Sequence, residues 1–116
     1  MLFRSPALCA ELAEQGVVLD LCPTSNRQAG TVPSAGAHPL GRLLRAGVRV
    51  TCSTDSRTVC SATLPGELQG AAIAQGLTTA ELVALQRTAL EAAFLHDDEP
   101  LRARLLADLD RAAAGA

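Results

Sequence analysis

Two short apolar runs constrain the fold of this chain more than any other feature: VVLDL at residues 17–21 and VRVTCS at residues 48–53. Both are rich in β-branched and aliphatic residues, and the first suits a strand that is buried on both faces. Between them, PLGRLLRAG at residues 39–47 carries three leucines at helical spacing and stops at Gly47. This order predicts a βαβ unit, in which the two strands are parallel neighbours joined by a right-handed crossover.

A sheet of two parallel strands is not stable alone, because each strand leaves backbone donors and acceptors unpaired along an apolar edge. The sequence therefore predicts that the chain is the end of a larger α/β protein. In such proteins the chemistry gathers where the strands end at their carboxyl termini. The residues that follow 17–21 and 48–53 are the first place to look for a site.

Helices are predicted on both sides of this unit. Ser5 can cap a helix that has Pro6 at its first position and ends at Gly16. The stretch CPTSNRQAGTVPSAGAHP, residues 22–39, is dense in Pro, Gly, Ser and Thr, which predicts a long loop. Loops of this length within compact domains are more often functional than idle.

Three C-terminal helices are predicted between residues 64 and 113. The second of them starts with a capping box formed by Thr78 and Glu81, and apolar residues follow at helical spacing. The third repeats leucine on one stripe and can be capped by Asp97 or Asp98. The final AAAGA is expected to fray.

Composition and charge narrow the class of protein. The net charge of -2 argues against a basic nucleic-acid-binding surface, and no apolar run approaches the roughly 20 residues that cross a bilayer. The four cysteines show neither a C-x-x-C pair nor a disulfide framework, so they are predicted to be reduced core thiols. A zinc knuckle built from them and His38 lacks the usual close spacing. We expect a cytoplasmic protein that binds neither nucleic acid nor a membrane.

One acid, Asp55, directly follows the second predicted strand in the polar segment STDS, residues 53–56. Such a carboxylate could simply cap a helix or form an Asx turn, which is a common use of this sequence. It could also serve a site at the carboxyl end of the strand. Serine-hydrolase chemistry at Ser56 is disfavoured, because no matched histidine base or G-x-S-x-G turn accompanies it.

Three segments in order, LDLCPTSN, HPLGRLLRAGVRV and STDS, resemble the C-terminal portion of adenosine deaminase, the zinc-dependent adenosine/AMP deaminase family of the amidohydrolase superfamily. The resemblance extends from about Pro6 to about Leu109, and CPTSN looks more like the adenosine than the adenine branch. It implies an α/β fold that is a partial domain over residues 1–116: the last two β/α units of a (β/α)8 TIM barrel plus C-terminal helices. It places strand seven at 17–21, strand eight at 48–53 and the C-terminal helices at 64–113.

The resemblance also implies roles for two residues. The family's strand-eight motif is typically Asn-Thr-Asp-Asp-Pro, and here it reads STDSR. By position Asp55 is the zinc ligand, and a carboxylate oxygen suits a divalent ion held mainly by imidazoles. Ser56 replaces the second Asp, which hydrogen-bonds the purine; serine can still form a hydrogen bond but carries no charge. No catalytic residue of the family is identified on this chain.

The remaining zinc ligands and the catalytic glutamate of the family are absent from this sequence. Its two histidines, His38 and His96, match no ligand position and are predicted to be surface or helix-end residues. The complete family member implies hydrolytic deamination of adenosine to inosine and ammonia by zinc-activated hydroxide. The isolated chain is expected to be inactive. The alternative is a non-catalytic remnant, or a module that completes a barrel with a separate N-terminal half.

Overall fold

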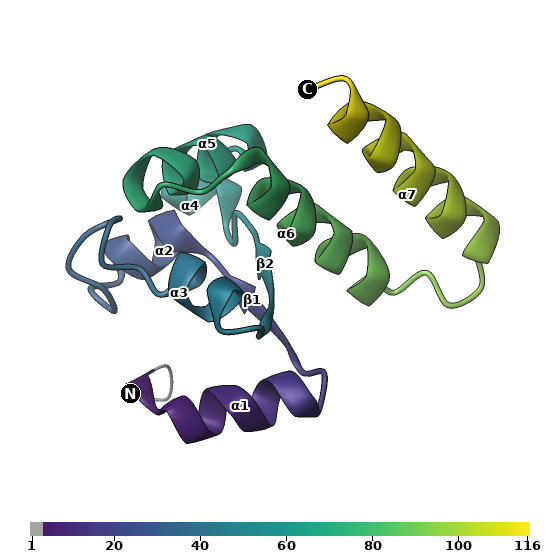
Figure 1. Cartoon of the computed structure of the whole chain (residues 1–116). Helices are drawn as coiled ribbons and strands as arrows, with labels where there is room; N and C mark the ends of the chain where they lie inside the picture. The colour runs from purple at the N-terminus through teal and green to yellow at the C-terminus, as the bar shows by residue number, and fades with distance from the viewer. Residues whose placement is uncertain (1–3) are drawn as a thin grey trace.

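The predicted βαβ unit forms the centre of the molecule. The computed structural model describes residues 4–116. In it, β1 (Val18–Leu21) and β2 (Arg49–Cys52) lie parallel and are hydrogen-bonded neighbours. The chain between them contains α2 (Pro23–Gln28) and the crossover helix α3 (Leu40–Arg45), as Figure 1 shows. The prediction of parallel neighbouring strands is confirmed, and each strand is a little shorter than predicted.

The two faces of this sheet differ in polarity. Val50 and Cys52 are buried on one face. On the other face, Oδ1 of Asp20 accepts hydrogen bonds from the hydroxyls of Thr51 (2.6 Å) and Ser53 (2.5 Å). The prediction that residues 17–21 are buried on both faces is wrong: Asp20 is exposed and the other residues of β1 are half-buried, because the apolar core covers one face.

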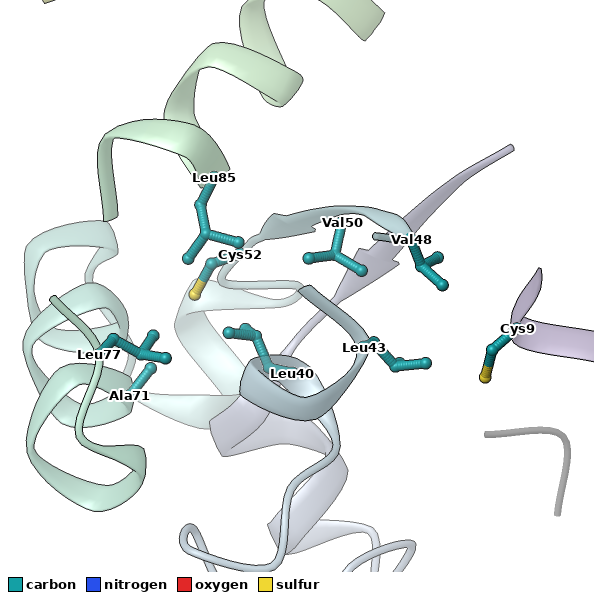
Figure 2. Packing of buried hydrophobic residues seen from close by; sticks show 9 residues of the cluster. All are labelled: Cys9, Leu40, Leu43, Val48, Val50, Cys52, Ala71, Leu77 and Leu85. Atoms are coloured by element: carbon teal, nitrogen blue, oxygen red, sulfur yellow. The ribbon is translucent and has the colours of Figure 1, made fainter. Parts of the chain in front are cut away.

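The apolar core lies between β2 and helices that come both before and after it in the chain. It joins α3, α5 (Leu64–Gln75) and α6 (Thr79–Ala92) to β2, with α1 (Pro6–Glu14) at its edge. The buried side chains shown in Figure 2 are Cys9, Leu40, Leu43, Val48, Val50, Cys52, Ala71, Leu77 and Leu85. Because these groups are small or aliphatic, the core holds together by close packing rather than by aromatic area.

The predicted helix caps are present. Oγ of Ser5 accepts the Leu8 N–H at the start of α1. Thr78 and Glu81 form the full capping box of α6. Asp98 caps α7 (Glu99–Ala114), which includes the first three residues of the final AAAGA and ends before Gly115.

Two short helices were not predicted. α2 occupies the start of the predicted loop 22–39, with Pro23 at its first turn, where the missing N–H of proline costs nothing. α4 (Arg57–Cys60) directly follows β2 and is capped by Ser56, whose Oγ accepts the Val59 N–H at 3.4 Å. Both lie within the polar stretches where the site was expected.

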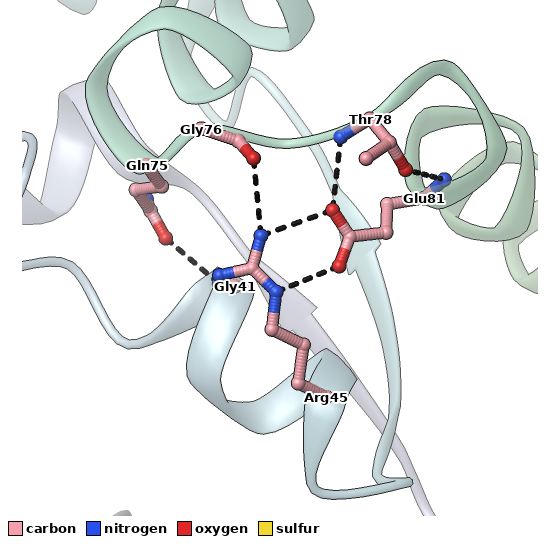
Figure 3. Close-up of polar contacts among 6 residues, drawn as sticks. All are labelled: Gly41, Arg45, Gln75, Gly76, Thr78 and Glu81. Atoms are coloured by element: carbon pink, nitrogen blue, oxygen red, sulfur yellow. Dashed lines mark hydrogen bonds and ion pairs between the residues drawn. The ribbon is translucent and has the colours of Figure 1, made fainter.

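Charged side chains fix the C-terminal helices. Arg45 of α3 forms two hydrogen bonds with the carboxylate of Glu81 and a third with the Gly76 carbonyl, as Figure 3 shows. Arg102 of α7 donates to the carbonyls of Leu90, Glu91 and Ala93, which end α6. α7 therefore packs on α6, which in turn packs on β2 (Figure 1). No helix in the described part of the chain is long and apolar enough to span a bilayer.

Candidate functional site

The carboxyl ends of the two strands bring Ser25 and Asp55 together. Because the strands are parallel, the segments that follow them leave the same edge of the sheet. The Ser25 hydroxyl donates a hydrogen bond of 2.8 Å to Oδ2 of Asp55. Asp55 has φ +55°, a left-handed conformation that few residues other than glycine adopt.

Three consecutive residues after β1 each bond to a different part of the chain. The Thr24 N–H donates to Oε2 of Glu67 in α5 (3.1 Å), Ser25 donates to Asp55, and Oδ1 of Asn26 accepts from Nε2 of His38 (2.9 Å). We call Thr24, Ser25 and Asn26 the TSN segment. Its three contacts connect α5, the end of β2 and the loop before α3.

His38 is buried, so the prediction of a surface residue is wrong for it, but the prediction of a helix-end residue is confirmed, because His38 directly precedes Pro39, the N-cap of α3. Only 4% of the residue is exposed. Nδ1 accepts the Leu40 N–H (3.2 Å), which leaves the proton on Nε2 for donation to Asn26. Burial lowers the pKa of His38, and the charge of Glu67 partly opposes this shift. The imidazole is therefore a neutral structural bridge. His96 is exposed between α6 and α7, as predicted.

Glu67 is a residue that the sequence analysis missed. It is 5% exposed, and its one described contact is with the Thr24 N–H. A buried carboxylate needs such donors, because burying a charge without them is costly. A signal was available in the sequence: Glu67 is the one charged residue in the helix LPGELQGAAIAQ, where an exposed face would carry several.

Two thiols beside this segment have raised pKa values. Burial, followed by the charges of Asp20, Asp55 and Glu67, raises the pKa of the Cys22 thiol to about 11. Burial also raises the pKa of Cys52 to about 12. Both thiols are therefore protonated at neutral pH in the metal-free chain. All four cysteines are free, as predicted.

A catalytic metal ion does not fit the described residues by themselves. Within residues 4–116 no three His, Cys, Asp or Glu side chains gather in a way that could hold one. Catalytic zinc is held by about three protein ligands, and Asp55 offers one oxygen donor. A metal centre at this edge of the sheet needs donors from outside the described chain.

Two adjacent parallel β/α units, followed by helices, define a segment of an α/β barrel with its candidate site at the carboxyl ends of the strands. The solved structure of adenine deaminase from Arthrobacter aurescens has the same fold, with a TM-score of 0.86 and 19% identity, over 93% of this chain and 32% of that one. The chain is therefore a C-terminal fragment of a TIM barrel.

The chain belongs to the adenosine deaminase family, whose model matches residues 3–112. The adenine deaminase of Sinorhizobium medicae (strain WSM419) is 47% identical over 102 residues, which are 88% of this chain and 31% of that protein. The N6-methyl-AMP deaminase of Arabidopsis thaliana matches with a TM-score of 0.81 and 25% identity, over 97% of this chain and 33% of that one. The chain thus spans about a third of the length of these relatives.

Proposed function

We propose that this chain forms the C-terminal part of the catalytic barrel of a hydrolytic 6-aminopurine deaminase. In that reaction water supplies an oxygen to the purine carbon that carries the amino group, and ammonia leaves. The observation that supports this best is the placement of Asp55, held by Ser25 at the carboxyl edge of two barrel strands. The family membership of the chain supports the reaction class.

Asp55 has the role of one oxygen ligand to a Zn2+ ion in this proposal. Its position in the STDS segment agrees with the zinc-binding Asp of the family motif, and hard oxygen donors suit divalent ions. The other ligands come from the remainder of the barrel, whether that is encoded in the same polypeptide or another. The isolated chain is inactive under this proposal, because one ligand does not hold a catalytic metal.

Ser56 is proposed to face the purine. Its hydroxyl oxygen accepts the Val59 N–H, which leaves the hydroxyl proton available for donation to a ring nitrogen or exocyclic group. Aspartate is also a good N-cap residue. Ser56→Asp should therefore keep α4 intact while it restores a charged acceptor.

Adenine is a better first substrate to test than adenosine. The resemblance in the CPTSN segment favoured the adenosine branch, but the relative at 47% identity is named an adenine deaminase. The N6-methyl-AMP deaminase matches at 25% identity. We therefore place adenine ahead of adenosine as the substrate, and both belong in the assay.

The second candidate is a barrel-completing module without activity of its own. Both outer edges of the two-stranded sheet lack strand partners within residues 4–116. An open edge offers backbone groups to a further strand. This candidate and the deaminase proposal differ in whether the assembled barrel deaminates a purine.

The test is to combine the purified chain with the unmatched N-terminal two-thirds of the Sinorhizobium medicae adenine deaminase. Ammonia release is measured with adenine and with adenosine in the presence of Zn2+. We expect activity from the mixture, none from either part alone, and loss of activity with Asp55→Ala but not with the surface variant Glu91→Gln. A stable complex that holds zinc but turns over neither purine would favour the inactive module. Turnover by the isolated chain would overturn the assignment of Asp55 as one ligand among several.

A further inference from the structure

Two hydrogen bonds, through the neighbouring residues Ser25 and Thr24, connect Asp55 to Glu67 in α5. Oδ2 of Asp55 accepts a hydrogen bond from the Ser25 hydroxyl (2.8 Å). The N–H of the adjacent residue, Thr24, donates to Oε2 of Glu67 (3.1 Å). Glu67 lies in α5, 43 residues from Thr24 in the sequence. Neither Ser25 nor Glu67 is assigned a role by the proposed function, but both lie on this path.

Glu67 makes no other hydrogen bond or ion pair in the described structure. A carboxylate that is 5% exposed lies inside a helix of otherwise uncharged residues, and its one described partner is a backbone N–H. A charge-assisted hydrogen bond of this kind is about twice as strong as a neutral one, and it is directional. Since α5 packs on the core through Ala71, its carboxylate is a fixed point for the TSN segment.

Asp55 needs such support, because its backbone conformation is unfavourable. The left-handed region costs a residue with a side chain on the order of 1 kcal/mol, less for Asp than for most, and such a residue persists where its surroundings hold it. Ser25 is the described side chain that bonds to the Asp55 carboxylate. If the TSN segment shifts, this bond is lost and the carboxylate no longer has one preferred orientation.

We propose that Glu67 is a positioning residue, which fixes the TSN segment through the Thr24 N–H so that Ser25 orients the Asp55 carboxylate. This inference rests on the proposed function for its purpose, because an oriented carboxylate is what a metal ligand requires. It concerns the geometry of this chain alone. Glu67 acts through two other residues and does not touch the reacting atoms.

The test is nuclear magnetic resonance of the chain without metal or substrate. The readouts are amide exchange at Thr24 and the one-bond Cα–Hα coupling of Asp55, which is smaller at positive φ than at negative φ. We expect Glu67→Ala to speed exchange at Thr24 by about tenfold or more and to move the Asp55 coupling toward a conformational average. Glu67→Gln keeps an acceptor oxygen in place and should restore much of both signals.

The control is Glu81→Ala. Glu81 also accepts a backbone N–H, from Thr78, but it lies at the start of α6 and has no described contact with the TSN segment. It should lower stability and leave the Asp55 coupling unchanged. An equal change in Glu81→Ala would show general loosening and overturn the proposal, as would a folded Glu67→Ala chain with a wild-type Asp55 coupling.

A second variant covers the case in which Glu67→Ala does not fold. Ser25→Ala removes one half-buried hydroxyl, and an Asp55 coupling that stays at its wild-type value there would overturn the last step of the path. Glu67→Gln then tests the first step: because an acceptor oxygen remains, Thr24 exchange should stay near its wild-type rate, and unprotected exchange in a folded Glu67→Gln chain would count against the proposal. These measurements can fail while deamination by the assembled barrel stands, and the reverse also holds.

Discussion

Arg45 on α3 holds both carboxylate oxygens of Glu81 at the first turn of α6, with Nε to Oε1 at 2.7 Å and Nη2 to Oε2 at 3.0 Å. The same carboxylate accepts the Thr78 N–H that completes the capping box (Figure 3). One side chain thus caps a helix and joins it to the crossover of the βαβ unit. The fixed fork of arginine suits this bidentate contact, whereas lysine could not reproduce it.

This pairing predicts an acid-sensitive contribution to stability. Hydrogen bonds from Arg45, followed by the Thr78 N–H, lower the pKa of Glu81 from 4.5 to about 2. The lowered pKa means that the contribution is fully present above pH 4.5 and is lost as the pH falls toward 2. The urea midpoint of Glu81→Gln should lie below that of the wild type at pH 6, and the gap should close by pH 2. Glu14→Gln serves as the control, and a constant gap would contradict the prediction.

His38 predicts a second pH effect in a separate range. Burial lowers its pKa below 6.5 in the folded state, so the unfolded chain binds the proton more tightly. The contribution of neutral His38 is therefore present above pH 6.5 and declines as the pH falls below it. The urea midpoint of the wild type should drop between pH 7.5 and 5.5, and His38→Gln should remove most of that slope. His96→Gln should keep it; equal slopes in wild type and His38→Gln would contradict the role of His38.

Leu85 should be among the most sensitive positions in the core. It is 1% exposed and lies where α6 packs against β2. Leu85→Ala is expected to lower the free energy of unfolding by about 2–5 kcal/mol, since it leaves a cavity in a close-packed region. Ile73→Ala is the matched control, because Ile73 is 78% exposed and should change the free energy by no more than about 0.5 kcal/mol. Denaturant unfolding of both variants measures the difference.

Arg102 should stabilise the packing of α7 on α6. Its side chain is 14% exposed, and it donates to the three carbonyls of Leu90, Glu91 and Ala93. Arg102→Ala should cost about 1.5–3 kcal/mol, because these carbonyls lose a charged donor. It should also speed proteolysis between residues 93 and 98. Arg102→Lys should recover part of the loss, and Arg111→Ala, at an exposed ion pair, should change little. Cleavage at the wild-type rate in Arg102→Ala would contradict this role.

Local signals in the sequence predicted much of the fold. Ser5, Thr78 and Asp98 cap the helices they were expected to cap, because capping depends on a few neighbouring residues. The parallel order of the strands also followed from the chain, since a strand, helix and strand in succession have few ways to pack. The half-exposed β1 could not be predicted in the same way, because burial depends on what covers each face.

The candidate site was predictable in part. Asp55 could be singled out from its place after a strand, but its hydrogen bond with Ser25 depends on a partner 30 residues away. His38 could be placed before a helix, but its hydrogen bond with Asn26 joins residues 12 apart that no local pattern connects. Glu67 carried a weak signal as a lone charge in an apolar helix. Long-range partners of this kind become visible once the chain is folded.

The contacts of the TSN segment limit where a barrel of this family can be cut to join parts of two proteins. Glu67, Asp55 and His38 all lie on this chain, between residues 38 and 67, so each described side-chain contact of the segment is internal. A chimera that exchanges residues 17–67 as one cassette keeps these contacts, and a junction placed between residues 26 and 38 separates all three pairs. Engineers who recombine barrels of this family should therefore choose crossover points outside residues 17–67.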